Sequence, residues 1–325
     1  MTEQTTTRAA IDPILKMLLD TFPLTFTAAD GVEVARERLA AMKAPPELLP
    51  KLRIEDRTVG CGELTDIPVR IYWPPVPAHD NLPIVVYYHG GGWCLGSLDT
   101  HDPVARAHAV GADAIVVSVD YRLAPENPFP AGIDDSWAAL RWVGEHAAEL
   151  GGNPNRIAVA GDSAGGNIAA IMAQLARDNV DAGGPALAFQ LLWYPSVTGD
   201  LSLPSFTENA NAPILDRDVI DAFLSWYVPG VDITDDHTAL PATLCPANAA
   251  DLSGLAPAFI GTAEHDPLRD DGARYAELLT AAGVPAELSN EPNMVHGYVN
   301  FALVVPAAAE ATNRGLVALK KALSS

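Results

Sequence analysis

The chain has 325 residues, of which 49% are hydrophobic and 19% charged, a balance typical of globular proteins and not of disordered ones. Asp and Glu number 41 against 20 Lys and Arg, which gives a formal net charge of −21. Because nucleic acids and anionic membrane surfaces repel such a chain, we expect neither as a partner.

Two further patterns bear on location. Residues 1–10 are polar and do not resemble a secretory signal, and no apolar run approaches the length of a membrane span. A cytoplasmic protein without integral membrane association is therefore expected.

Cys61, Cys94 and Cys245 are odd in number and far apart, which favours reduced thiols over a disulfide framework or a metal site.

The first 50 residues are expected to form helices that stand apart from the rest of the chain. Apolar side chains recur at helical spacing between Ile11 and Leu19, and residues 32–42 fit a second helix. Prolines at 45, 46 and 50 then interrupt the pattern.

Strand-like and helical patterns alternate through most of the remaining chain. The predicted strands are residues 53–60, 67–73, 83–88, 114–119, 156–160, 186–193, 257–261 and 286–289. The predicted helices are residues 103–110, 133–148, 166–176, 272–282 and 307–323. Near-continuous apolar strands that alternate with helices predict an α/β fold, with a mostly parallel sheet covered on both faces.

Residues 195–255, here called the insertion, interrupt this alternation. They contain one clear helical pattern, at 218–227, among many Pro, Asp and Asn residues. A long insertion between adjacent strands is more often a lid or a binding segment than a plain connection. We therefore divide the chain into an N-terminal helical segment (1–50), an α/β core (51–194 and 256–325) and the insertion (195–255).

A candidate nucleophile lies in the segment Gly161-Asp162-Ser163-Ala164-Gly165-Gly166, which follows the predicted strand 156–160 and precedes a helix expected to start near Asn167. This is the context of a nucleophile elbow, where a tight turn lifts the serine hydroxyl above the sheet. The first N–H groups of the helix then point at developing negative charge. GxSxG alone is a weak pattern, and a glycine-rich turn without chemistry is its alternative.

The segment His89-Gly90-Gly91-Gly92-Trp93 follows the predicted strand 83–88 and is a rarer pattern. Consecutive glycines leave their backbone N–H groups open to an oxyanion. A phosphate-binding loop is the competing use, but no Lys-Ser/Thr follows and the sequence has no GxGxxG, so a nucleotide site is disfavoured.

A serine nucleophile requires a base and a carboxylate that orients the base, and in α/β hydrolases the chain order is serine, acid, histidine. His237, His265 and His296 follow Ser163. His237 lies in the insertion and is expected at the surface, and His265 adjoins the acid candidate. His296 follows the last predicted strand and is the favoured base.

The acid is sought in the loop after the predicted strand 257–261. Asp266 is favoured because it lies deep in this loop, before Pro267, and Glu264 stays an alternative. Asp270 and Asp271 are expected to cap the following helix at its N-terminus.

Together these motifs resemble those of the bacterial hormone-sensitive-lipase-like esterases, over residues 84–298. The resemblance extends to the segments 120–126 (DYRLAPE), 128–131 (PFPA) and 266–270 (DPLRD), and it departs mildly at Tyr298, where His-Gly-Phe is usual. It implies an α/β-hydrolase fold, with a mostly parallel eight-stranded sheet, helices on both faces and a helical cap. The N-terminal helices (1–50) and the insertion (195–255) would form this cap over the catalytic core (51–194 and 256–325).

The resemblance also implies roles for particular residues. The triad would be Ser163, Asp266 and His296, and the oxyanion donors would be the backbone N–H groups of Gly91, Gly92 and Ala164. Arg122 and Glu126 are expected to pair beneath the glycine loop. Apart from the resemblance, Trp93, Tyr194, Phe206, Ile214 and Leu215 are candidates for the pocket wall, and a position in the ordinary core is the alternative for each of them.

The expected activity is hydrolysis of short- to medium-chain acyl esters through an acyl-enzyme, without a metal or organic cofactor. An amidase or deacetylase with the same triad is one alternative. A catalytically silent ligand receptor on the same fold is another, and the possibility of a homodimer is left open.

Overall fold

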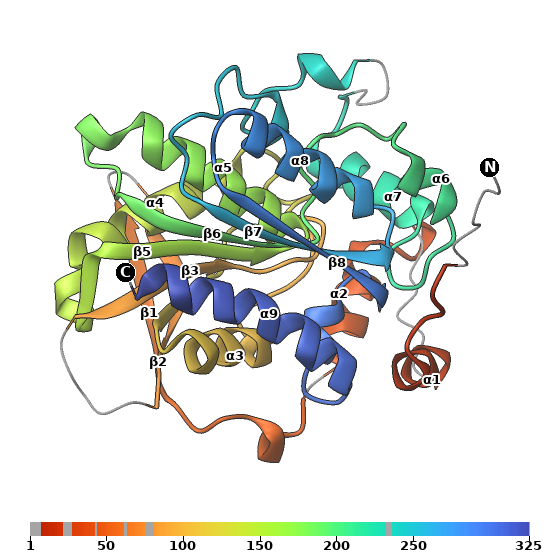
Figure 1. The fold of residues 1–325 in the computed structure, drawn as a ribbon, viewed down its shortest axis with the longest axis horizontal. Helices are drawn as coiled ribbons and strands as arrows, with labels where there is room; N and C mark the ends of the chain where they lie inside the picture. Colours follow the sequence, from red (N-terminus) through yellow and green to blue (C-terminus); the bar gives the residue numbers. More distant parts are fainter. Residues whose placement is uncertain are drawn as a thin grey trace, which may run out of the picture.

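The computed structural model describes residues 8–21, 28–42, 44–61, 64–75, 81–231 and 236–324. Its centre is an eight-stranded sheet with the strand order β1-β2-β4-β3-β5-β6-β7-β8 (Figure 1). The strands are β1 (Arg53–Cys61), β2 (Leu64–Trp73), β3 (Leu82–Tyr88), β4 (Ile115–Val119), β5 (Gly152–Asp162), β6 (Leu187–Trp193), β7 (Ala258–His265) and β8 (Ala286–Val295). β2 runs antiparallel to both β1 and β4, and all other pairs are parallel.

Helices cover both faces of this sheet. The α-helices are α1 (Pro13–Thr21), α2 (Val32–Ala40), α3 (Asp102–Ala112), α4 (Ala131–His146), α5 (Ala164–Asp178), α6 (Pro204–Glu208), α7 (Arg217–Tyr227), α8 (Arg269–Ala281) and α9 (Pro306–Leu323). α4, α5 and α8 pack on one face, and α3 and α9 pack on the other (Figure 1). The predicted mostly parallel sheet with helices on both faces is confirmed.

The burial of β3 explains why its sequence is apolar without alternation. Val86 and Tyr88 belong to the core beneath α4 and α5, whereas Val85 and Tyr87 belong to the core beneath α3 and α9. Successive side chains of a strand point to opposite faces, so a strand covered on both faces needs apolar residues at every position.

Several element boundaries differ from the predicted ones. β8 continues to Val295 instead of ending at 289, because its pairing with β7 extends through polar residues to the pair His265 and Val295. The insertion contains α6 and two short 3₁₀ helices besides α7, so the prediction of one helix there was wrong. A five-residue helix such as α6 is too short to show helical periodicity.

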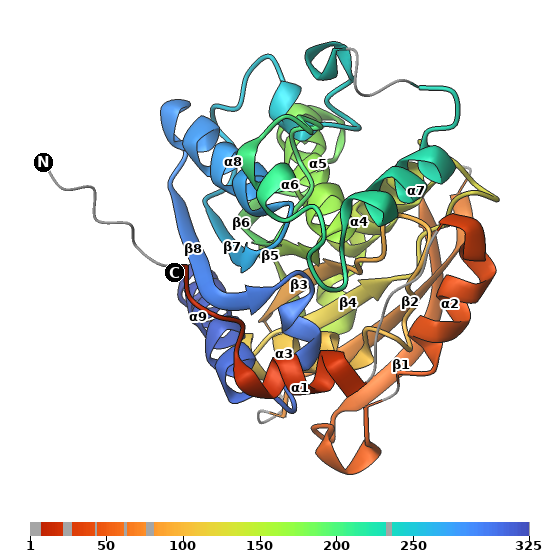
Figure 2. The same ribbon diagram turned by 90° about the vertical axis from the view of Figure 1, so that its right-hand side faces the viewer.

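The insertion and the N-terminal segment meet at one end of the sheet. α2, α6 and α7 lie beyond the carboxyl ends of the central parallel strands (Figures 1 and 2). In open α/β sheets this end is where ligands bind. Residues 1–7, 22–27 and 43 of the predicted N-terminal helical segment lie outside the described residues.

The cysteines can be located in part. Cys94 and Cys245 are buried free thiols. Burial raises the pKa of each thiol to about 12, so both are inert at neutral pH. The side chain of Cys61 lies outside the described part of the chain.

Candidate active site

Ser163 occupies the single residue between β5 and α5. Its backbone has φ 56° and ψ −119°, a strained conformation for a residue with a side chain. Gly165 follows in the first turn of α5, and a Cβ there would lie 2.0 Å from the carbonyl oxygen of Tyr88. The helix can approach the end of β3 this closely only because that residue is glycine. α5 starts at Ala164, three residues before the predicted start, and the strand–turn–helix context of the motif is confirmed.

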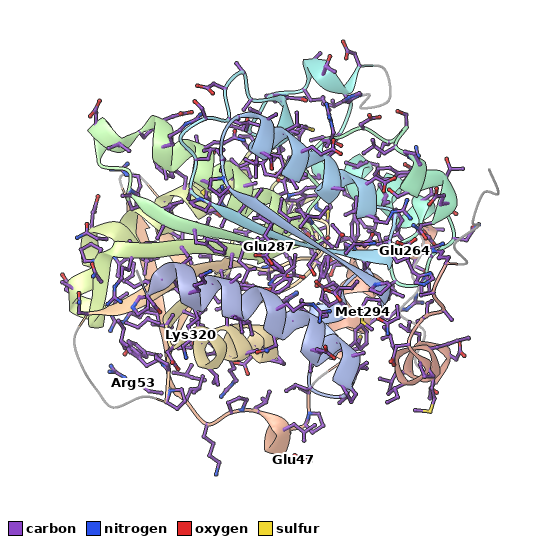
Figure 3. All side chains as sticks on the ribbon, in the orientation of Figure 1. Glu47, Arg53, Glu264, Glu287, Met294 and Lys320 are labelled. Carbon is purple, nitrogen blue, oxygen red and sulfur yellow. The ribbon has the colours of Figure 1, made fainter. Side chains whose placement is uncertain are left out.

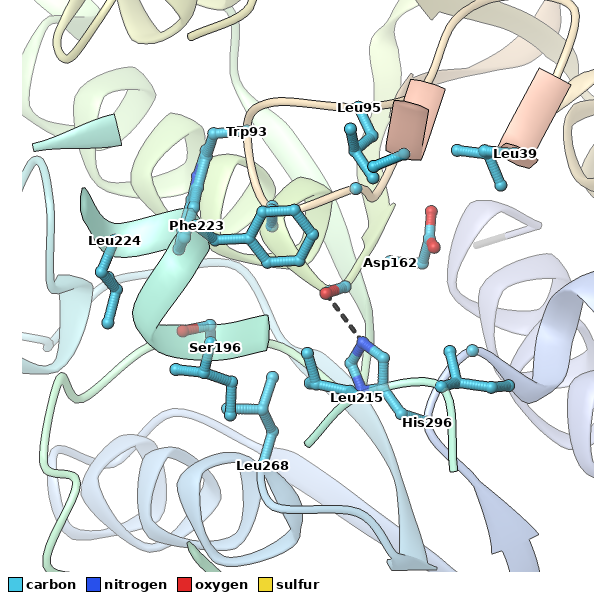
Figure 4. Close-up of a pocket in the computed structure, with 18 of the residues that line it drawn as sticks. Leu39, Trp93, Leu95, Asp162, Ser196, Leu215, Phe223, Leu224, Leu268 and His296 are labelled. Carbon is cyan, nitrogen blue, oxygen red and sulfur yellow. Dashed lines mark hydrogen bonds between the residues drawn. The ribbon is translucent and has the colours of Figure 1, made fainter. Parts of the chain in front are cut away.

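A chain of two hydrogen bonds connects Ser163 to a buried carboxylate. His296 Nε2 lies 2.9 Å from Ser163 Oγ, drawn as the dashed line in Figure 4, and His296 Nδ1 lies 2.7 Å from Asp266 Oδ2. A carboxylate only accepts, so Nδ1 carries the proton and Nε2 is left free to accept one from the serine. Asp266 is fully buried, and its other oxygen accepts from the N–H of Leu268 at 2.8 Å.

The alternative bases and acid are engaged elsewhere. His237 lies near Asp200 at 3.8 Å within the insertion. His265 Nε2 donates to the carbonyl oxygen of Ala9 at 2.9 Å. Glu264 accepts from Arg269 at 3.0 Å and from Asn290 at 2.9 Å. The structure therefore brings Asp266 and His296 to Ser163, and it gives Glu264, His237 and His265 other partners.

The glycine loop lies beside the serine hydroxyl. Gly91, Gly92 and Ala164 line the same cavity as Ser163 and His296. Among the described residues, no backbone hydrogen bond uses the N–H of Gly91 or Gly92. The N–H of Ala164 belongs to the first turn of α5, where no helical carbonyl is available to it. The site thus presents three backbone donors that have no helical or turn partner.

The backbone and the surroundings of Gly92 favour glycine. Its φ is +59°, and a Cβ would lie 2.2 Å from the ring of Phe223 on α7. The insertion therefore packs directly against the predicted oxyanion loop.

A buried acidic residue adjoins the nucleophile. Asp162 faces His101 Nε2 at 3.6 Å and accepts a hydrogen bond from the hydroxyl of Tyr87. Burial by itself raises the pKa of Asp162, but His101 and the hydrogen bonds outweigh it and hold the pKa at about 2. Burial lowers the pKa of the neighbouring His89 to about 3, so that ring stays neutral. The charge of Asp162 is thus compensated within the protein.

The cavity above Ser163 has a volume of about 180 Å³ and a mostly apolar wall. Of the predicted pocket residues, Trp93, Phe206, Ile214 and Leu215 line it. Tyr194 does not: it is fully buried, and its ring packs against that of His296 with centroids 4.7 Å apart. The prediction for Tyr194 was wrong because this residue lies beneath the histidine, on the core side.

Further lining residues were missed in the sequence. They are Ala35, Leu39, Leu95, Ile220, Phe223, Leu224 and Leu268, among others. Figure 4 shows the ring of Phe223 close to the dashed bond that ends on His296. Ile220, Phe223 and Leu224 recur at helical spacing, and this apolar stripe was the available signal.

The predicted pairing of Arg122 with Glu126 was wrong. Arg122 pairs with Asp135 at 2.8 Å, and Glu126 pairs with Arg36 of α2 at 2.8 Å, so Arg122 and Glu126 do not hold each other. Arg122 is thus held by α4, and Glu126 by α2.

Asp270 and Asp271 do not cap α8. They lie in its first turn, and their side chains accept from the insertion: Asp270 from the N–H of Ser205 at 2.9 Å, and Asp271 from the N–H of Thr198 at 2.7 Å. Burial raises the pKa of Asp271 to about 7.

The family model for the α/β hydrolase fold matches residues 85–300. The chain belongs to the α/β-hydrolase fold family. It is 81% identical to the carboxylesterase NlhH of Mycobacterium tuberculosis, over 99% of both chains, and 56% identical to the esterase LipI of the same species, over 97% of this chain and 96% of the other. The resemblance to bacterial hormone-sensitive-lipase-like esterases is thereby confirmed.

Solved structures share this fold. DphMB1 superposes with a TM-score of 0.88 at 54% identity, over 97% of this chain and all (100%) of the other. A hyperthermophilic esterase from the archaeon Pyrobaculum calidifontis superposes with a TM-score of 0.84 at 39% identity, over 96% and 99% of the two chains.

Two features are absent from the described residues. These residues hold no cluster of three or more His, Cys, Asp or Glu side chains arranged to bind a metal ion. No helix in the described ranges is both long and apolar enough to cross a membrane.

Proposed function

We infer that this α/β hydrolase is a serine carboxylesterase in which Ser163 is the nucleophile, His296 the general base and Asp266 the residue that orients the base. The observation that carries this proposal is the chain of hydrogen bonds from Ser163 Oγ through His296 to Asp266, at 2.9 and 2.7 Å, on the floor of an apolar cavity. The esterases at 81% and 56% identity support the same reaction class.

Acylation follows from this geometry. His296 Nε2 takes the proton of Ser163 Oγ as the oxygen attacks the ester carbonyl and forms the new C–O bond. When the tetrahedral intermediate collapses, Nε2 gives this proton to the departing alcohol, and the bond from carbon to the alcohol oxygen breaks. Water then repeats both steps on the acyl-enzyme and releases the acid. Asp266 stays ionised and keeps the proton of the imidazole on Nδ1.

The carbonyl oxygen becomes negative in each tetrahedral intermediate. The N–H groups of Gly91, Gly92 and Ala164 are the donors that we assign to it. Because they are part of the backbone and already in place, little reorganisation is needed when the charge develops, and one such donor typically lowers the barrier by about 3–4 kcal/mol.

The wall of the cavity supports small and medium acyl esters as substrates. A cavity of about 180 Å³ with apolar walls suits an aliphatic chain of limited length. We propose that residues 1–50 and 195–255 act together as the cap, since Leu39 and Phe223 from these two segments both line the cavity. Two predictions from the sequence stay predictions: a cytoplasmic location and the absence of nucleic-acid partners. The possibility of a homodimer stays open.

Labelling with a fluorophosphonate probe tests the assignment. The wild-type protein should be labelled covalently and Ser163→Ala should not, because the probe reacts with an activated serine. A folded wild-type protein that resists labelling would favour the silent receptor. Matched p-nitrophenyl ester and p-nitroanilide substrates with the same acyl group separate an esterase from an amidase, and we expect turnover of the ester only.

A further inference from the structure

The loop that carries Asp266 is held from outside by the insertion. Here this loop, residues 264–270, is called the acid loop. Asn209, only 4% exposed, donates from its side-chain Nδ2 to the carbonyl oxygen of Asp266 at 3.0 Å and to that of Glu264 at 3.3 Å. Ser205, fully buried in α6, donates from Oγ to the carbonyl oxygen of Pro267 at 2.6 Å.

The orientation of the Asn209 amide is determined by a cation. Its Oδ1 accepts from Arg8 Nη2 at 2.5 Å, and Arg8 also donates to the carbonyl oxygen of Glu264 and pairs with the Glu264 carboxylate at 3.2 Å. A guanidinium only donates, so the amide oxygen must face Arg8 and the amide N–H₂ must face the acid loop. Figure 3 shows Glu264 at the end of the sheet where α6 and α7 lie.

These contacts bear on the triad because the backbone of Asp266 is held from two sides: its carbonyl oxygen accepts from Asn209 Nδ2 and, within the acid loop, from the N–H of Arg269 at 3.1 Å. One oxygen of the Asp266 carboxylate accepts from the N–H of Leu268 within the acid loop, at 2.8 Å, and the other accepts from His296. A shift of the loop backbone therefore moves the carboxylate relative to the imidazole. Displacements of about 1 Å in catalytic geometry can cost about 10²-fold in rate.

We propose that Asn209 is a positioning residue for the catalytic acid, so that the insertion contributes to the chemistry as well as to the wall of the cavity. The inference rests on the proposed role of Asp266. Asn209 does not contact the substrate; it holds the carbonyl oxygen of Asp266 and keeps the carboxylate in line with His296 Nδ1.

The first test compares two asparagines of the insertion. Asn248 is the matched control, because its Nδ2 also donates to two carbonyl oxygens, those of His237 at 2.6 Å and Leu240 at 3.0 Å, away from the acid loop. Asn209→Ala should lower kcat on p-nitrophenyl butyrate about 10- to 100-fold with KM within about twofold. Asn248→Ala should keep the wild-type kcat. Equal losses in both variants would mean that Asn209 serves only the fold of the insertion.

The second test is a double-mutant cycle with Asp266→Ala. If Asn209 acts through Asp266, Asn209→Ala costs nothing further once the carboxylate is gone. The same fold-loss in both backgrounds would overturn the proposal. Wild-type activity in the Asp266→Ala variant would overturn the triad itself. If Asp266→Ala loses most of its activity but Asn209→Ala keeps the wild-type kcat, only the role of Asn209 is overturned.

A milder pair of variants covers the case in which Asn209→Ala does not fold. Arg8→Met removes the donors that orient the amide, and Arg177→Met is its control, because Arg177 likewise donates to two loop carbonyl oxygens, those of Asp251 and Ser253. Arg8→Met should lower kcat about threefold or more, as expected for one weakened hydrogen bond, while Arg177→Met leaves kcat unchanged. Indistinguishable kcat values in the two variants would count against the proposal.

Discussion

Asp162 Oδ1 accepts a hydrogen bond from the N–H of Gly90 at 2.9 Å, so the residue before the nucleophile holds the loop that carries the proposed oxyanion donors. Both segments are chain turns at the ends of neighbouring strands, β5 and β3. The carboxylate is buried and ionised, with a pKa of about 2. The serine and the oxyanion loop are therefore built as one unit.

This contact predicts different outcomes for two substitutions of Asp162. Asp162→Ala leaves the Gly90 N–H and the Tyr87 hydroxyl buried without an acceptor, which typically costs about 1–3 kcal/mol for each group. We expect kcat to fall about 10- to 100-fold or more. Asp162→Asn keeps an acceptor oxygen and should retain more activity than the alanine variant. The measurement is kcat of both variants on a soluble ester. A higher kcat in Asp162→Ala than in Asp162→Asn would show that the hydrogen bond from Gly90 to Asp162 does not support the oxyanion loop.

The proposed triad should behave as one unit. Ser163→Ala and His296→Ala should each lower ester hydrolysis by at least about 10³-fold, and the double variant should be little worse than either single one. Glu264→Ala should lose far less activity than Asp266→Asn, because the Glu264 carboxylate contacts arginine and asparagine side chains and not His296. Substantial activity in Ser163→Ala or in His296→Ala, above the hydrolysis measured without enzyme, would exclude the assignment.

Gly92 is the position at which the oxyanion loop can be tested with the least damage. A Cβ at Gly91 would lie 2.4 Å from the carbonyl oxygen of Leu95, and φ there is +122°, so Gly91→Ala strains the backbone itself. At Gly92 φ is +59°, in the left-handed region that a residue with a side chain can adopt at some cost, and the nearest obstacle is the side chain of Phe223, which can move. Gly92→Ala should lower kcat by two to three orders of magnitude, about the cost of one displaced donor.

A companion variant separates two causes of that loss. Gly92→Ala combined with Phe223→Ala provides space for the new methyl group. If steric displacement of the loop is the cause, the double variant should recover activity relative to Gly92→Ala. Wild-type rates in Gly92→Ala, with normal thermal unfolding, would show that the loop is a turn without a catalytic role.

The size of the cavity limits the acyl chain. Activity on p-nitrophenyl esters should be highest for short to medium chains and should collapse for long ones, because residues of the proposed cap line a cavity of only about 180 Å³. The measurement is kcat/KM across a series of chain lengths. Rates that keep rising to the longest chains, with activation at a lipid interface, would indicate a lipase with a mobile lid.

Asp271 should make the protein less stable as pH rises toward neutrality. Burial raises its pKa in the folded state to about 7, against an ordinary value of 3.8. Between these values the folded protein keeps a proton that the unfolded chain has lost. The free energy of unfolding therefore falls as pH rises through this window, by at most about 1.4 kcal/mol per pH unit, and this contribution is constant above it.

Asp271→Asn removes this titration. Urea unfolding of the wild type and Asp271→Asn between pH 4 and about 8 should show a smaller loss of stability with rising pH in the variant. Parallel curves for the two proteins would mean that Asp271 titrates normally in the fold.

Local patterns in the chain were sufficient to locate the strands, the elbow at Ser163, the glycine loop and the loop of Asp266. Each depends on interactions between residues close in sequence: the burial of consecutive strand residues, a turn that demands glycine, a helix that begins after a strand. The order of serine, acid and histidine along the chain left three candidate bases, and the position of His296 after the last predicted strand favoured it over the other two. These features could be predicted because their physical causes act over a few residues.

The partners of the polar side chains depended on the tertiary structure. Glu126 pairs with Arg36, 90 residues away, and Asn209 donates to Asp266, 57 residues away. Tyr194 faces the core and not the cavity because β6 and His296 meet there. Long side chains have many possible partners at similar energy, and which one is within reach is decided only when distant segments pack together. The wall of the cavity and the support of the acid loop are therefore properties of the folded chain.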